Sequence, residues 1–190
     1  MRNLWEWWLP VVNNPLTRGR AGLVVATCAG IVGAQGLLIL TWSATGDLEG
    51  ETALIALLLT LLWGSIALLA RAGRVKLAAW LLVGLLFLLI TADVAGYGLG
   101  SPAAAAYFLP VLLALCALGF GAGLAVACAS AAMVWLIAAA LAAGWYEALT
   151  PFEISHLTFN APTLTVLLAL GTLIVGLWTR YLTHNVNRDA

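Results

Sequence analysis

The chain consists of long apolar runs separated by short polar segments. Six runs, at about 21–42, 52–70, 77–96, 102–118, 121–144 and 162–182, are rich in Leu, Ala, Val and Ile and almost free of charge. A helix needs about 20 residues to cross the ~30 Å hydrocarbon core of a bilayer, and the runs are close to that length. They do not alternate polar and apolar residues, as the strands of a membrane barrel would. The pattern predicts an all-α integral membrane protein, a bundle of six transmembrane helices.

Composition agrees with this pattern. Hydrophobic residues make up 64% of the chain, charged residues 8%, and the mean hydropathy is +1.05. A soluble domain has about 25% charged residues, so these few charges cannot cover a globular surface in water. The lipid bilayer is therefore the first expected partner. Acidic and basic residues balance at eight each, and we expect no nucleic-acid partner.

The positions of the basic residues predict the orientation. They all lie before the first run, between the second and third, or at the end of the sixth and after it: Arg2, Arg18, Arg20, Arg71, Arg74, Lys76, Arg180 and Arg188. With six spans, these segments share one side of the membrane. Lys and Arg accumulate on the cytoplasmic side, so we expect a multi-pass protein of the bacterial inner membrane with both termini inside. The first run is longer than the core of a signal peptide and is interpreted as a span.

The chain is expected to have three parts. Residues 1–16 carry Trp5, Trp7 and Trp8 and predict a short amphipathic helix and linker at the cytoplasmic interface, where indole rings are favoured. Its tryptophans would anchor it in the headgroup layer or, alternatively, dock a partner protein. Residues 17–184 form the membrane domain, and 185–190 form a short cytoplasmic tail.

Two ridges of small residues recur at four-residue spacing. Such ridges let helix backbones approach each other closely in lipid. Either helix packing within the chain or a homodimer interface would use them. The first ridge is Gly22, Ala26, Gly30 and Ala34, and the second is Gly119, Gly123, Ala127 and Ala131.

Few residues offer chemistry inside the membrane. Asp93 is the one ionisable candidate within a run, and the helix rise places it about 25 Å from Lys76, near the outer edge of the hydrocarbon. It has either a structural role or a role in sensing a ligand or a proton. Gln35 is the second polar candidate, most simply for a hydrogen bond between helices. Nucleotide-binding and metalloprotease motifs are absent, and the three cysteines lack C-x-x-C spacing. We therefore expect no enzyme, no catalytic or metal site and no cofactor.

Several segments resemble a known bacterial module. They are "NNPLTRGRAGL" at 13–23, "GRVKLAAWLL" at 73–82, "LLIT" at 88–91, a glycine-rich turn closed by Ser101 and Pro102, and "LPVLLALCALGFGAGLAVACASA" at 109–131. Together they resemble the six-helix membrane input region that precedes the catalytic parts of sensor histidine kinases and diguanylate cyclases. That family normally continues into a cytoplasmic linker and an enzymatic domain, whereas this chain ends at Ala190.

Two function classes remain open. The resemblance implies a signal-input, sensor-like membrane domain without an attached output domain, which relays a stimulus through the exit of the sixth helix at Arg180 and Tyr181. The nine tryptophans and the short length suggest instead an accessory or scaffold subunit of a larger membrane complex, associated with lipids or pigments. Other membrane subunits or a second copy would then be its partners. A small carrier is a third possibility.

Overall fold

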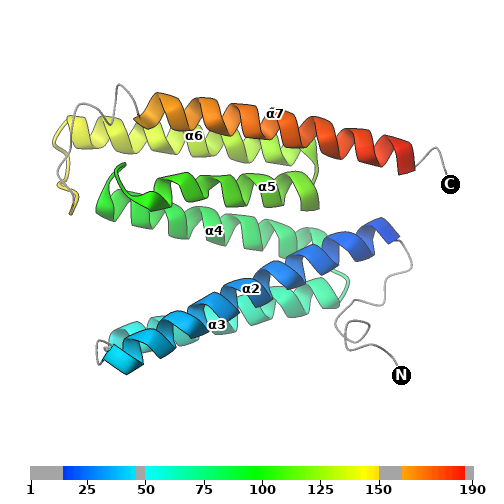
Figure 1. The fold of residues 1–190 in the computed structure, drawn as a ribbon, viewed down its shortest axis with the longest axis horizontal. Helices are drawn as coiled ribbons and strands as arrows, with labels where there is room; N and C mark the ends of the chain where they lie inside the picture. The colour runs from blue at the N-terminus through cyan, green and yellow to red at the C-terminus, as the bar shows by residue number, and fades with distance from the viewer. Residues whose placement is uncertain (1–14, 46–49, 150–159, 187–190) are drawn as a thin grey trace. The chain divides into compact units, whose positions relative to one another are not determined.

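The computed structural model describes residues 15–45, 50–149 and 160–186, and within these ranges it contains helices and no strands. The elements in chain order are α2 (Pro15–Thr45), α3 (Gly50–Arg71), α4 (Val75–Tyr97), the 3-10 helix η1 (Pro102–Tyr107), α5 (Phe108–Ala117), α6 (Phe120–Ala142) and α7 (Ala161–Val186), as drawn in Figure 1. Helices α2, α3, α4 and α6 are long and apolar enough to cross a membrane. The prediction of an all-α protein with apolar, membrane-spanning-capable helices is therefore confirmed.

Each predicted run contains a helix with similar bounds. The largest difference is at the start of the first run, where α2 begins at Pro15, so that Arg18 and Arg20 are helical. Proline suits the first helical position because its fixed φ matches the helix and its missing N–H has no partner there. The fourth run is divided into η1 and α5, and the Pro102–Ala117 segment is shorter than the other apolar helices. The six-span count and the side of the termini stay predictions.

The chain divides into two compact units, residues 1–82 and 83–190, with the boundary inside α4. In the first unit α2 and α3 run antiparallel and pack side by side (Figure 1). Gln35 joins them, because its Nε2 donates to the Ala56 carbonyl oxygen over 2.7 Å. Trp63 on α3 is the largest buried side chain among the described residues and is only 2% exposed.

The second unit contains the rest of α4, then η1, α5, α6 and α7. Helices α5, α6 and α7 each contact the other two, and η1 contacts both α5 and α7. The polypeptide leaves α4 at Gly98, whose φ of +81° is one that glycine adopts without strain. The amide of Leu149 donates to the Gly96 carbonyl oxygen over 2.9 Å, which fixes the segment after α6 to the end of α4.

Some predictions concern residues that the structure does not describe. The interfacial helix with Trp5, Trp7 and Trp8 lies outside the described residues, as do positions 187–190 of the predicted tail. Helix α7 continues to Val186, so the first two residues of that tail are helical.

Candidate functional site

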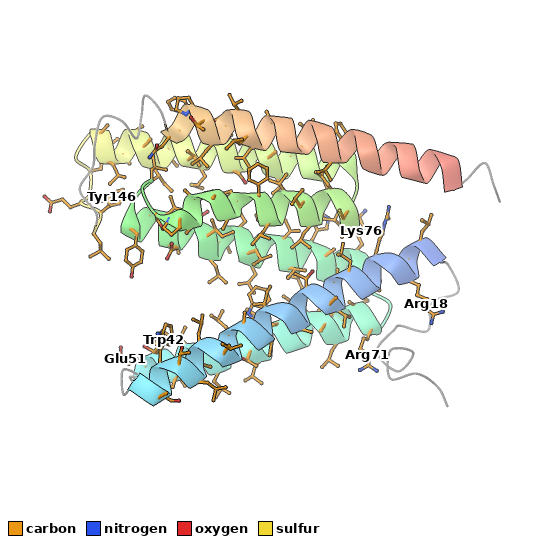
Figure 2. All side chains as sticks on the ribbon, viewed as in Figure 1. Arg18, Trp42, Glu51, Arg71, Lys76 and Tyr146 are labelled. Atoms are coloured by element: carbon orange, nitrogen blue, oxygen red, sulfur yellow. The ribbon has the colours of Figure 1, made fainter. Side chains whose placement is uncertain are left out.

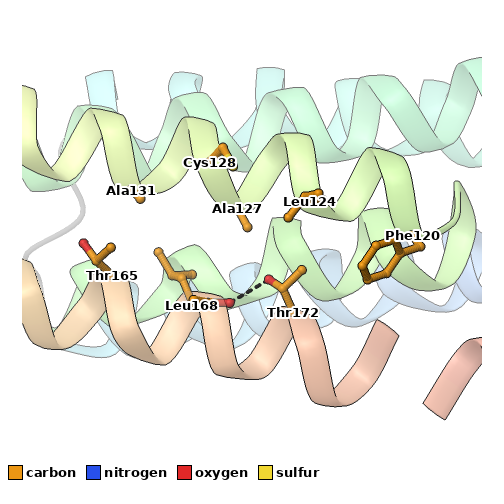
Figure 3. Close-up of a pocket in the computed structure, with 9 residues that line it drawn as sticks. Phe120, Leu124, Ala127, Cys128, Ala131, Thr165, Leu168 and Thr172 are labelled. Carbon is orange, nitrogen blue, oxygen red and sulfur yellow. Dashed lines mark hydrogen bonds between the residues drawn. The ribbon is translucent and has the colours of Figure 1, made fainter. Parts of the chain in front are cut away.

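A cavity of about 290 Å³ lies between α6 and α7 in the second unit (Figure 3). Helix α6 supplies one wall and α7 the other, and small side chains on both helices leave the space. The lining residues are Phe120, Leu124, Ala127, Cys128, Ala131, Thr165, Leu168, Ala169 and Thr172. An apolar cavity of about 150 Å³ is enough to hold benzene, so this volume accommodates a small apolar molecule.

Specific contacts hold the two helices together at both ends of the cavity. Beyond one end, Trp135 on α6 donates from Nε1 to the Thr165 Oγ1 on α7 over 3.1 Å. At the other end the Phe120 ring lies against Gly176 of α7, where any Cβ would overlap it. The Phe108 ring of α5 lies against Gly171 of α7 in the same way, so that a Cβ at Gly171 would overlap it. The cavity is therefore a gap between contacts, since α6 and α7 cannot simply slide together and close it.

The two hydroxyl hydrogens that line the cavity are already donated within α7. Thr165 Oγ1 donates to the Ala161 carbonyl oxygen over 2.8 Å, and Thr172 Oγ1 donates to the Leu168 carbonyl oxygen over 2.6 Å. A threonine hydroxyl has a single hydrogen, so neither has another to give to a ligand. A charged or strongly polar molecule would lose its water and gain few partners, so an apolar molecule fits the chemistry of this site better.

Asp93, the predicted polar candidate, belongs to a separate cluster in the last turns of α4. It is half-buried, and its Oδ2 accepts a hydrogen bond from Ser101 Oγ over 3.1 Å. The same Ser101 Oγ accepts from the amide of Ala103 over 3.2 Å and so caps η1, as the Ser-Pro pattern indicates. The carboxylate thus fixes the start of η1 to α4. A role of Asp93 in sensing stays a prediction.

Tyr107 extends this cluster into the interior of the unit. Its side chain is fully buried, its hydroxyl lies 2.9 Å from Thr91 Oγ1, and its ring lies 5.7 Å from the Phe87 ring, centroid to centroid. The Thr91 hydroxyl has a single hydrogen and donates it to the Phe87 carbonyl oxygen, so the Tyr107 hydroxyl is the donor to Thr91. These contacts join η1 to the middle of α4.

Gln35 does what the sequence predicts, since it makes a hydrogen bond between helices. The Gln35 Oε1 is buried without a hydrogen-bond partner. The Ala56 carbonyl oxygen, which accepts from Gln35 Nε2, also accepts from Thr60 Oγ1 over 2.9 Å. The bond lies in the first unit, and Asp93 lies in the second. The structure does not describe the two candidates as parts of one site.

The two small-residue ridges have opposite surroundings. On α6, Gly123 and Ala127 are buried, and a Cβ at Gly123 would overlap Leu115 of α5; Ala131 lines the cavity, and Gly119 caps the helix start. This ridge packs helices within the chain. On α2, by contrast, Ala26, Gly30 and Ala34 are exposed and Gly22 is half-buried, and a Cβ at Gly30 would have no neighbour within 4 Å.

The sequence pattern did not single out the residues of the cavity on α7. In the sequence, Thr165 and Thr172 are ordinary members of an apolar run, as is Trp135, the α6 residue that donates to Thr165. The sequence does contain two glycines in the sixth run, Gly171 and Gly176, which indicate close contacts of this helix with its neighbours. They are five residues apart and so do not form a ridge with four-residue spacing. In the described part of the chain, no three His, Cys, Asp or Glu side chains come together as a metal site would require.

The comparisons with known proteins add no relative. The chain matches no protein-family model, no curated protein and no solved structure.

Proposed function

We propose that the chain is a non-catalytic, multi-pass protein of the bacterial inner membrane that acts as a signal-input domain, with six spans and both termini in the cytoplasm. Its stimulus is an apolar molecule dissolved in the bilayer, which enters the cavity between α6 and α7. Helix α7 then carries the response toward the C-terminus, past Arg180 and Tyr181. The resemblance to the membrane input regions of sensor kinases and cyclases supports the class of function.

The observation that carries this proposal is the position of the cavity against α7. Fixed contacts at Trp135 and Gly176 flank the cavity, so a guest molecule that wedges the walls apart must shift these contacts. Packed helices respond to such a wedge by moving as rigid bodies rather than by bending locally. A change at the cavity would thus reach the end of α7.

Binding is tested first, with the natural cysteines as reporters. Cys128 lines the cavity and Cys116 on α5 does not, yet both are exposed. We expect dodecanol, added to the purified protein in detergent, to slow the reaction of Cys128 with N-ethylmaleimide and to leave Cys116 unchanged. Protection of neither thiol, or equal protection of both, would exclude the cavity as the binding site.

The relay is tested by hydrogen exchange along α7. Dodecanol is expected to change amide exchange in wild type as far as the last turns of α7, and to change nothing in Ala131→Phe, whose ring fills the cavity. Exchange that changes only beside the cavity would show binding without a relay and would refute the input role. Leu136→Phe is the matched control: like Ala131 it is on α6, but its side chain is exposed, and this variant should respond like wild type.

An accessory subunit of a larger membrane complex is the second candidate. The exposed ridge Ala26, Gly30 and Ala34 on α2 favours it, because such a surface suits close contact with another membrane helix. Extraction in a mild detergent distinguishes the two candidates. A chain that never migrates above its own mass would exclude the subunit role and leave the input role untouched.

A further inference from the structure

Five basic side chains gather at one end of the first unit, and we call this group the basic end: Arg18, Arg20, Arg71, Arg74 and Lys76. The bond between Gln35 and Ala56 sets the level of α2 against α3. Counting 15 residues from each of these positions, back along α2 and forward along α3, reaches Arg20 and Arg71, so both lie about 22 Å from that bond on the same side. Arg74 follows in the turn to α4 and Lys76 in the first turn of α4. Figure 2 shows Arg18, Arg71 and Lys76 at the same end.

No carboxylate in the described part of the first unit lies near Arg18, Arg20, Arg74 or Lys76. Within the described part of the first unit the one acidic residue is Glu51, at the opposite end of α3. Arg18, Arg20, Arg74 and Lys76 are all exposed. In the described part of the first unit, these four side chains therefore form a surface of one sign of charge.

The helix dipole favours Arg71, which lies in the last turn of α3, but it does not explain the basic residues at the two helix starts. Arg18 and Arg20 lie in the first turns of α2, and Arg74 and Lys76 flank the start of α4. A helix N-terminus carries partial positive charge and unpaired N–H groups, so cations are disfavoured there and anions are favoured. Arg18, Arg74 and Lys76 thus lie where the start of a helix disfavours a cation. Both the side chains and the two helix starts attract an anion to the same place.

The level of the basic end in the membrane indicates which anion this is. Glu51 and Arg71 are 20 residues apart on α3, which is about 30 Å, the thickness of the hydrocarbon core. The basic end therefore lies at the level of lipid headgroups. Leu68, one turn before Arg71, and Leu77, beside Lys76, are exposed apolar side chains just inside that level. A lipid can place its phosphate on the arginines and its acyl chains on these leucines, whereas a free phosphate cannot use both.

We propose that the basic end is a binding site for the headgroup of an anionic phospholipid. Phosphate oxygens accept paired hydrogen bonds from arginine, and a headgroup with net negative charge is bound more tightly than a zwitterionic one. This site is in the first unit and does not depend on the cavity in the second. Failure of one proposal leaves the other standing.

Native mass spectrometry of the full chain in a neutral detergent tests the site. We expect phosphatidylglycerol to bind more tightly than phosphatidylcholine. Each basic side chain near a headgroup contributes about fivefold in affinity, so Arg18→Gln with Arg20→Gln should weaken phosphatidylglycerol binding by about 30-fold. Arg18→Lys with Arg20→Lys keeps the charge and should lose far less. Glu51→Gln, at the other end of the same helix pair, is the matched control and should change nothing.

Several results would overturn the proposal. Equal affinity for the two lipids, or unchanged binding in the double glutamine variant, would show that the basic end does not select anionic headgroups. Release of the lipid by millimolar glycerol phosphate would assign the site to a free phosphate instead. Both double variants change exposed residues, and circular dichroism checks that each keeps its native helix content. If the glutamine pair misfolds, its loss of binding is disregarded and the lysine pair decides. Equal binding of the two lipids by a folded lysine pair would overturn the site.

Discussion

Replacing Gly123 and Gly30 by alanine, one at a time, adds the same methyl group to two helices with opposite surroundings. At Gly123 the new Cβ would overlap the Leu115 side chain and would lie 3.2 Å from the Leu115 Cα. At Gly30 it would meet nothing within 4 Å. Both positions belong to ridges that the sequence makes look alike, so the pair separates tertiary packing from sequence pattern.

The expected difference follows from two opposing contributions. Alanine stabilises a helix interior over glycine by up to about 1 kcal/mol, and both variants share this gain. Overpacking a well-filled contact costs about 1–3 kcal/mol. Only Gly123→Ala has this cost, because the new methyl group meets the backbone of Leu115, which cannot move aside as the end of a flexible side chain can. The free energy of unfolding of Gly123→Ala should therefore be about 1–3 kcal/mol below that of Gly30→Ala. For a chain of this size the melting temperatures should differ by several degrees.

Thermal unfolding in detergent, followed by circular dichroism, measures this difference. Each variant is melted as a monomer, confirmed by light scattering, so that contacts between copies at the α2 ridge do not contribute. Equal melting temperatures, or a lower one for Gly30→Ala, would refute the packing of α6 against α5 through Gly123.

Two further predictions concern buried hydroxyl groups that have no hydrogen-bond partner, at Ser130 and Tyr146. Ser130 on α6 is fully buried, so Ser130→Ala should raise the free energy of unfolding by about 1 kcal/mol, and a lower value would reveal an unseen partner. Burial raises the pKa of the Tyr146 phenol above its ordinary value of 10.0. The unfolded chain therefore loses this proton first, and stability should hold below about pH 10 and fall as the pH rises further. Tyr146→Phe should remove one tyrosine step above pH 10 from an absorbance titration and weaken the alkaline loss of stability. An unchanged titration would contradict the burial.

Much of the fold could be predicted because lipid imposes strict local rules. A run such as 77–96 must be helical in a membrane, since no water is available to satisfy its backbone groups. Short-range signals then set the limits: the glycine at 98 ends this helix, and Ser101 before Pro102 starts the next one. The interhelical role of Gln35 was also predictable, because a polar amide in an apolar helix needs a partner.

The candidate site was not predictable in the same way. Which side chain lies against Gly123, Gly171 or Gly176 depends on how α5, α6 and α7 meet, and the partners Leu115, Phe108 and Phe120 are distant from most of them in the chain. The cavity exists because bulky contacts at its two ends keep small residues apart in the middle. No local window of sequence contains both sides of that arrangement.

By itself the sequence determined the class of the protein: apolar helices, their approximate limits, and the separation of basic from acidic residues along the chain. These properties depend on each residue and its near neighbours, through helix geometry and the cost of placing charge in lipid. The tertiary structure decided which of two similar small-residue ridges is buried, where α6 and α7 leave a cavity, and that Arg20 and Arg71 lie at one level. These depend on contacts between segments far apart in the chain, where the volume of each side chain counts only against the particular surface that it meets.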